Sequence, residues 1–172
     1  GAHRDLHSFP TRRSSDLQIN VPAVHELGIT GAGVLIGMLD SGFKTTHRAF
    51  EELDVVDKWD FVNDDPIVEN EVDDPWDAHS HGTMTLSTIG GRMEGRQFGV
   101  APDAGFVLAK TEDSGSESAI EEDNWVAGIE WLESLGVDIA PSSLGYRDWY
   151  EYSDMDGNTA ASTIAADLAV GK

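Results

Sequence analysis

Cysteine is absent from the sequence. Disulfide bonds, a cysteine nucleophile and zinc sites built on cysteine thiolates are therefore excluded, although the absence does not decide in which compartment the protein works. Long apolar runs are also missing, since no stretch reaches the roughly 18 apolar residues that a membrane-spanning helix needs. The sequence thus predicts neither a disulfide framework nor a membrane span.

Basic residues are scarce. Lysine and arginine together number 11, against 32 aspartates and glutamates, which gives a formal net charge of −21 at pH 7. Binding to a phosphate backbone requires a basic surface that displaces counterions. A nucleic acid is therefore not expected as a partner.

Residues 1–17 differ from the rest of the chain. They are basic, show no hydrophobic periodicity and lack the apolar core of a secretory signal. The run HSFPTRRSSDL within them resembles the translation of a sequencing adapter. We therefore interpret residues 1–17 as a non-native or disordered leader. Residues 18–172 contain no linker or internal repeat, so we expect them to belong to one domain.

The most informative stretch is an apolar run that ends in an acidic residue. Val34 to Leu39 are apolar without strict alternation, which is typical of a strand buried on both faces. Asp40 follows at the carboxyl end of this expected strand, where ligands gather in α/β sheets, and leads into Ser41-Gly42. Such an acid can equally cap a turn through its side-chain oxygens. A second stretch is needed to decide between these interpretations.

That second stretch begins at His81. Small and apolar residues follow it to Ile89, and Gly90-Gly91 ends the pattern, which predicts a short buried helix with a histidine near its start. A lone histidine is as readily a surface group or a hydrogen-bonded core residue as a catalytic one. Its meaning depends on Asp40.

Together the two stretches resemble a known family. Leu39-Asp40-Ser41-Gly42 is similar to the aspartate motif of the subtilisin-like serine peptidases, the subtilases, and His81-Gly82-Thr83 is similar to their histidine motif. In that family the aspartate, the histidine and then a serine follow one another along the chain. The resemblance implies that His81 is the catalytic base and that Asp40 orients its imidazole.

A third segment resembles the part of a subtilase that binds substrate. Ser143, Leu144 and Gly145 are similar to the family's Ser-Leu-Gly segment, whose backbone pairs with an extended polypeptide. A plain exit from a strand is the alternative, and Pro141 removes one backbone donor from that strand. The resemblance further implies a bacterial protein that is secreted or located in the cell envelope and acts on polypeptides.

The nucleophile that the family requires is not found. No Gly-Thr-Ser and no Gly-x-Ser-x-Gly sequence occurs among the 172 residues. The resemblance covers residues 18–172 as the front part of a catalytic domain. We therefore expect a truncated serine endopeptidase domain, inactive by itself. We also expect it to aggregate or to be molten when made alone, because an incomplete sheet exposes an apolar edge.

The order of the expected elements predicts an α/β fold. Strands alternate with helices, which favours three layers: a mostly parallel sheet with helices on both faces. The expected strands lie at 34–39, 55–62, 106–110 and 137–140. The expected helices are a short one after Pro22, one from His81, one over 118–135 and one over 158–170.

Two details of the later helices are predicted from their patterns. In the helix over 118–135, Ile120 belongs to the expected apolar stripe, and the glutamates are expected to face outward, namely Glu121, Glu122, Glu130 and Glu133. The alternating polar residues at 154–158 fail the pattern of an EF-hand calcium loop. We interpret them as a turn that caps the last helix.

An acidic loop precedes His81. Its acidic residues are Asp64, Asp65, Glu69, Glu71, Asp73, Asp74 and Asp77. They fit either a solvated loop or a calcium site, but their spacing matches no calcium motif, so no metal ligand is assigned. Zinc binding by His79 and His81 is disfavoured, because the pair is not spaced i, i+4 and has no third strong ligand nearby.

Two other functional classes stay open at this stage. The first is a non-catalytic α/β binding module built on the same scaffold, which the absence of a catalytic serine from the complete gene would reveal. The second is a calcium-dependent acidic scaffold domain. A large rise in melting temperature with calcium, and no proteolysis, would favour that class.

Overall fold

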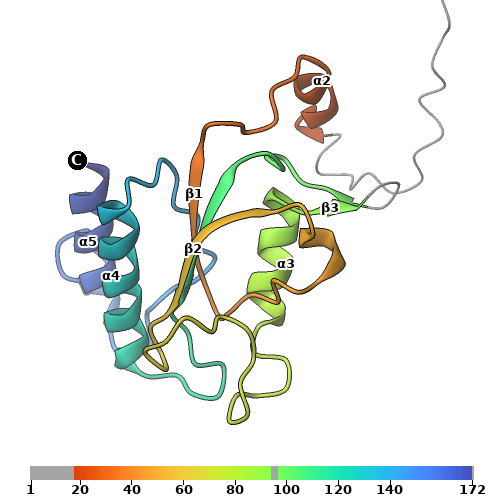
Figure 1. Ribbon diagram of the computed structural model, residues 1–172. Coiled ribbons are helices and arrows are strands. Elements are labelled where there is room, and N and C mark those ends of the chain that lie inside the picture. Colours follow the sequence, from red (N-terminus) through yellow and green to blue (C-terminus); the bar gives the residue numbers. More distant parts are fainter. Residues whose placement is uncertain (1–17, 94–96, 172) are drawn as a thin grey trace, which may run out of the picture.

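The computed structural model describes residues 18–93 and 97–171 (Figure 1). The interpretation of residues 1–17 as a leader lies outside these described residues. None of the helices in the described part of the chain combines the length and the apolar character needed to cross a membrane.

A parallel sheet forms the centre of the fold. Its strands are β1 (Leu35–Asp40), β5 (Gly105–Lys110) and β2 (Asp54–Asp60), in the order β1-β5-β2. The register places Asp40 opposite Lys110 and Lys110 opposite Asp60. Because the strands are parallel, their carboxyl ends and these three charged side chains meet at one edge of the sheet.

The expected strand at 137–140 is only partly formed. Two parallel bridges, Ile36 to Ile139 and Leu39 to Ser142, run this segment along the free side of β1. The Leu39 N–H donates to the Pro141 carbonyl over 3.4 Å, whereas Pro141 itself has no N–H to return. The segment therefore follows β1 to its carboxyl end without completing a regular ladder.

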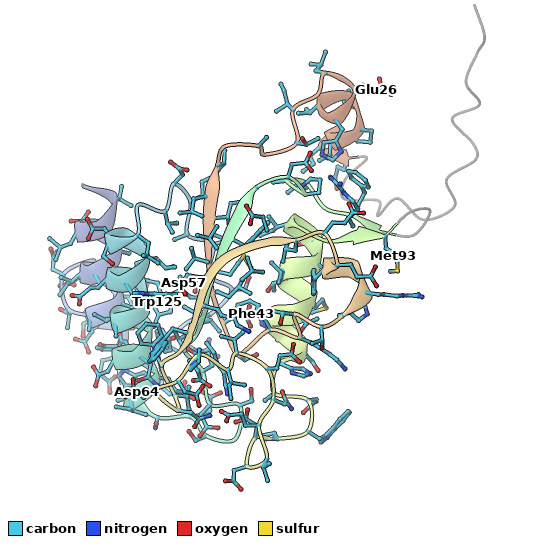
Figure 2. The ribbon with its side chains drawn as sticks, viewed as in Figure 1. Glu26, Phe43, Asp57, Asp64, Met93 and Trp125 are labelled. Carbon is cyan, nitrogen blue, oxygen red and sulfur yellow. The ribbon has the colours of Figure 1, made fainter. Side chains whose placement is uncertain are left out.

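Helices cover both faces of the sheet, which confirms the three-layer expectation (Figure 1). One face carries α3 (Ser80–Ile89), and the other carries α4 (Ala119–Ser134) and α5 (Ala161–Val170). Successive strand side chains point to opposite faces, so β5 sends Phe106 toward the α3 side and Val107 toward the α4 side. In Figure 2, Phe43 marks the first of these cores and Trp125 the second.

Smaller elements complete the described chain. They are α2 (Val21–Glu26), the antiparallel pair β3 (Arg92–Met93) and β4 (Gln97–Phe98), and two 3-10 turns, Arg48–Phe50 and Tyr152–Asp154. The short antiparallel pair was not expected, because two-residue strands carry no usable alternation.

The outward orientation expected for Glu121 and Glu122 is wrong. Their exposed fractions are 2% and 3%, whereas Ile120, expected in the apolar stripe, is 58% exposed. Ser118 and Glu121 form a capping box at the start of α4, which ties Glu121 back to the backbone. At a helix start the capping hydrogen bonds, and not the 3.6-residue period, decide which side chain turns inward.

Glu122 is buried because four donors converge on it. One carboxylate oxygen accepts hydrogen bonds from Ser162 N (2.8 Å) and Ser162 Oγ (2.7 Å), and the other accepts from Trp149 Nε1 (2.9 Å) and Tyr150 OH (2.7 Å). Burial disfavours the ionised form, but these hydrogen bonds outweigh it and hold the pKa of Glu122 below its ordinary value. Glu122 therefore joins α4 to the segment that follows residue 145.

The last helix begins later than expected. It starts at Ala161 instead of residue 158, and its Ncap, Ala160, offers no side-chain acceptor. Glu122 of the neighbouring helix accepts the Ser162 N–H in its place, and a carboxylate at a helix N-terminus is favoured by the helix dipole. The expectation that the turn at 154–158 caps this helix is therefore corrected: the cap comes from α4.

Candidate active site

Asp40 ends β1 and is almost completely buried, with 1% of its surface exposed. Its Oδ1 accepts hydrogen bonds from Ser41 N at 2.8 Å and from His81 Nδ1 at 2.7 Å. Its Oδ2 accepts a hydrogen bond from Thr85 Oγ1 at 2.9 Å. An aspartate that orients an imidazole, as the resemblance implies for Asp40, must lie within hydrogen-bond contact of it, and the structure places Asp40 and His81 in such contact.

His81 lies in the first turn of α3, and its side chain remains 46% exposed. When Nδ1 donates to the Asp40 carboxylate, the neutral imidazole carries its lone pair on Nε2. A half-exposed imidazole whose Nδ1 is held in this way has the geometry of a general base.

Gly82 explains why α3 begins so close to Asp40. A Cβ at this position would lie 2.2 Å from the carbonyl oxygen of Gly42 and 3.0 Å from the Asp40 Cβ. Gly42 itself has a φ of +125°, which L side chains rarely adopt. The two glycines let the helix start pack directly on the turn after β1, and this contact brings His81 to Asp40.

We predict that Gly82→Ala separates these two elements. The new methyl group meets backbone that cannot move aside, so the protein should lose at least about 2 kcal/mol of unfolding free energy. Urea unfolding of the complete protein measures this loss. Gly145→Ala is the matched control, because a Cβ there meets no atom within 4 Å. Equal stability of the two variants would contradict the close-packing argument.

A cavity of about 310 Å³ lies beside Asp40, between α3 and residues 141–143, which run alongside β1. Its lining residues are Met38, Asp40, Met84, Thr85, Thr88, Ile89, Pro141 and Ser143. A cavity of about 410 Å³ at β2 is lined by neither Asp40 nor His81. Of these two cavities, the one at the carboxyl end of β1 is lined by Asp40, whereas His81 lines neither.

The structure brings Ser143 to this cavity and holds the segment 143–145 at both ends. Trp125 Nε1 donates to Ser142 Oγ at 2.9 Å, and the Tyr146 hydroxyl donates to Glu112. Leu144 packs against the α4 and α5 core, while Ser143 and Gly145 are exposed. Within the described chain, the backbone groups of residues 143–145 form no hydrogen bond to other backbone groups.

Glu112 and Tyr146 form a half-buried pair that no sequence pattern predicts. Burial is the main cause that raises the pKa of Glu112 from 4.5 to about 7, and the charges of Glu121 and Glu117 add to it against the hydrogen bond from Tyr146. Burial and the neighbouring Glu112 carboxylate likewise raise the pKa of the Tyr146 phenol. The pair links the loop after β5 to the residue that follows Gly145.

We predict that this pair makes stability depend on pH. Between pH 4.5 and about 7 the unfolded chain releases the Glu112 proton while the folded chain retains it, so the free energy of unfolding falls as pH rises. Glu112→Gln keeps an acceptor for Tyr146 but cannot ionise. The free energy of unfolding of Glu112→Gln, relative to that of the unsubstituted protein, should therefore rise as the pH increases from 4.5 to about 7.

Urea unfolding of the complete protein at a series of pH values measures this difference, with Glu26→Gln, a substitution of an exposed glutamate, as the control. A stability difference between Glu112→Gln and the unsubstituted protein that is the same at pH 4.5 and pH 7 would refute the assignment.

Lys110 supplies a cation to the acidic loop. Its Nζ lies 2.7 Å from Asp60 Oδ2 and 2.9 Å from Asp74 Oδ2, and the side chains of Lys110 and Asp60 are 2% and 0% exposed. Burial alone would lower the pKa of Lys110, but the two carboxylates outweigh burial and raise it. The acidic loop is thus anchored to the end of β5, which fixes the chain just before α3.

His79 forms hydrogen bonds within the same loop. The Nδ1 of its ring accepts a hydrogen bond from the backbone N–H of Asn70 at 2.9 Å. The backbone N–H of His79 donates in return to Asn70 Oδ1 at 2.8 Å. Burial, together with the charge of Lys44, lowers the pKa of His79 against the opposing charges of Glu69 and Asp74. A neutral His79 therefore closes the loop on itself.

In the part of the chain that the structure describes, one group of potential metal ligands gathers within 4.8 Å: Asp60, Asp65 and Glu71. Asp60 already accepts hydrogen bonds from the Val62 and Asn63 N–H groups and pairs with Lys110. Neither His79 nor His81 belongs to this group. Within this acidic cluster, Asp60 is thus already engaged by Lys110 and two backbone donors.

Comparison with known proteins agrees with the resemblance found in the sequence. The model of the subtilase family matches residues 31–170. Subtilisin E of Bacillus subtilis is 33% identical over 165 residues, which are 95% of this chain and 37% of that protein. An alkaline protease of Alkalihalobacillus alcalophilus is 32% identical over 132 residues, or 74% of this chain and 30% of that protein. The chain thus spans about a third of these curated relatives.

Solved structures show the same fold. The crystal structure of MycP1 with its N-terminal propeptide removed matches with a TM-score of 0.64 at 22% identity, over 92% of this chain and 45% of that one. A cold-adapted subtilisin-like serine proteinase matches with a TM-score of 0.58 at 24% identity, over 83% and 44% of the two chains. Since the family match extends over most of the sequence and includes both motifs, the chain belongs to the subtilase family.

Proposed function

We propose that this chain is the part of a serine endopeptidase that carries the catalytic base, His81, and the acid that orients it, Asp40. The observation that supports this most strongly is the 2.7 Å hydrogen bond from His81 Nδ1 to the buried Asp40 carboxylate, between two motifs of the subtilase family. The family supports serine peptidase function in general, and the assignment of these two residues is our proposal.

The chemistry would proceed through the free nitrogen of His81. Nε2 takes the proton from a serine hydroxyl as the serine oxygen attacks the carbonyl carbon of the substrate, and later gives this proton to the leaving amine. Asp40 stays ionised, holds the imidazole in the required tautomer and stabilises the imidazolium. We propose that the serine belongs to a part of the complete protein outside these 172 residues, so that the present chain alone is inactive.

The substrate would be a polypeptide bound in extended form. The backbone groups of residues 143–145 are unpaired in the described chain, and this segment is held from both sides by Trp125 and Glu112. An extended peptide can pair with such a segment as an added strand. We therefore propose Ser143, Leu144 and Gly145 as substrate-binding residues, acting mainly through their main chain.

The place of action is proposed from the relatives. Subtilisin E and the alkaline protease described above both come from bacteria. We propose that the complete protein is secreted or located in the cell envelope of a bacterium. Expression of the complete gene with its natural start, followed by fractionation, would decide this, and recovery only in the cytoplasm would contradict it.

A fluorophosphonate probe tests the proposed activity, because such probes react with the activated serine of serine hydrolases. The complete gene product should be labelled at one serine outside residues 1–172, as identified by mass spectrometry of the labelled peptide. The 172-residue chain should not be labelled. Stoichiometric labelling of a serine inside the described chain would overturn the proposal, and the candidates are Ser41, Ser80, Ser87, Ser142 and Ser143. A folded complete protein that is not labelled would favour the non-catalytic binding module.

A further inference from the structure

The Asp40 carboxylate is held through both of its oxygens. Oδ1 faces His81 Nδ1 and also accepts the Ser41 N–H, which comes from the turn after β1. Oδ2 accepts a hydrogen bond from Thr85 Oγ1, which comes from α3. One donor on a single oxygen leaves a carboxylate able to rotate about its Cβ–Cγ bond. Donors on both oxygens fix its plane, and the plane decides whether Oδ1 points at His81.

The Thr85 hydroxyl has two possible acceptors and one proton. Asp40 Oδ2 lies at 2.9 Å, and the Gly82 carbonyl, one turn earlier in the helix, lies at 3.0 Å. Threonine hydroxyls in helices often donate to such a carbonyl, which would give Thr85 a purely local role. A hydrogen bond to a charged acceptor is stronger, and Asp40 is buried, where the low local dielectric strengthens it further. The carboxylate is therefore the preferred acceptor.

The position of Thr85 in the sequence matches this role. It follows His81 by four residues, so the two side chains lie on the same face of α3, one turn apart. One helix thus presents both the base and a donor that fixes the base's partner. The close packing at Gly82 sets the distance of both side chains from the end of β1.

We propose that Thr85 is a positioning residue: by donating to Asp40 Oδ2, it holds the carboxylate in the orientation in which Oδ1 binds His81 Nδ1. This proposal rests on the proposed peptidase function. It goes beyond that function because it assigns a role to a residue outside the Asp and His motifs.

Three variants of the complete protein test the proposal. Thr85→Val keeps the shape and removes the hydroxyl, whereas Thr85→Ser keeps the hydroxyl and removes a methyl group. Ser87→Ala is the matched control, because the Ser87 hydroxyl donates to the Met84 carbonyl in the same helix and is not a partner of Asp40. Circular dichroism checks folding, and Thr85→Ala replaces the valine variant if the latter does not fold.

The first readout is the rate of reaction. Thr85→Val should slow fluorophosphonate labelling and lower kcat by about tenfold or more, with KM changed less than twofold, because a charge-assisted hydrogen bond to the orienting acid is lost. Thr85→Ser and Ser87→Ala should stay within about threefold of the unsubstituted protein. A valine variant as fast as the unsubstituted protein, a serine variant as slow as valine, or an equal loss in Ser87→Ala would each overturn the proposal.

The second readout does not depend on activity. The proton that His81 Nδ1 donates to Asp40 gives a far-downfield signal in proton NMR. This signal should persist in Thr85→Ser and Ser87→Ala and should broaden or vanish in Thr85→Val. If the unsubstituted protein is not labelled by the probe, the proposed function fails, and the NMR comparison still decides the role of Thr85. An unchanged signal in Thr85→Val would refute that role.

Discussion

Replacing His81 by alanine in the complete protein should lower kcat by about 10⁶-fold, which is the loss that subtilisin itself suffers when its triad histidine is removed. Without the imidazole, the described side chains that still contact Asp40 are the hydroxyls of Ser41 and Thr85, which are not bases for the proton of the serine hydroxyl. Asp40→Asn should lower kcat by about 10⁴-fold, because an amide cannot stabilise the imidazolium and favours the wrong tautomer. Hydrolysis of a chromogenic peptide measures both losses.

His47→Ala is the control for these substitutions. His47 is exposed, and its side chain accepts the Ala49 N–H at the start of a 3-10 turn. Its loss should leave kcat within about threefold of the unsubstituted value. A His81→Ala protein that keeps more than about a hundredth of the activity would contradict the assignment of the base.

Replacing Lys110 by methionine should destabilise the protein by about 3–5 kcal/mol, since removal of one partner leaves the buried Asp60 charge without its counterion. Asp74 and the acidic loop would also lose their anchor to β5. Urea unfolding of the complete protein at neutral pH measures the loss. Lys44→Met is the control, because Lys44 is exposed and forms no ion pair within the described residues.

The pairing with Asp60 can be tested further with a double substitution. Asp60→Asn removes the charge that Lys110→Met leaves unpaired, so the double variant should be less destabilised than the sum of the two single variants. A loss below about 1 kcal/mol in Lys110→Met would show that this lysine does not hold the loop.

The parts of the site that lie in contiguous motifs could be predicted from the sequence. Asp40 ends an apolar strand and His81 begins a short helix, so local patterns place both residues. Parallel strand order then brings the two to one edge of the sheet. Local patterns also predicted the strands at 54–60 and 105–110 to within two residues of their observed bounds.

The parts that depend on contacts between distant residues could not be predicted. Lys110 pairs with Asp60 and Asp74, which lie 50 and 36 residues away, and nothing in its own strand distinguishes it from an exposed lysine. The burial of Glu122 is decided by Trp149, Tyr150 and Ser162, which lie 27, 28 and 40 residues away along the chain. Periodicity describes which face of a helix is apolar, and it fails where polar partners cover a charged side chain.

Thr85 lies between these two cases. Its spacing of four residues from His81 was visible, but a threonine inside a helix is more often a surface residue or bonds to its own helix. Only the close approach at Gly82 brings its hydroxyl to Asp40. A search for hydroxyl residues one turn after a candidate base would have found it.

The role of His81 as the base for a serine outside this sequence can be examined in a crystal structure of the complete protein with a fluorophosphonate bound. If His81 has this role, the labelled serine oxygen should lie within about 3.5 Å of His81 Nε2, while Nδ1 keeps its hydrogen bond to Asp40. A labelled serine more than about 8 Å from His81, or a label placed on a residue of the described chain, would contradict it.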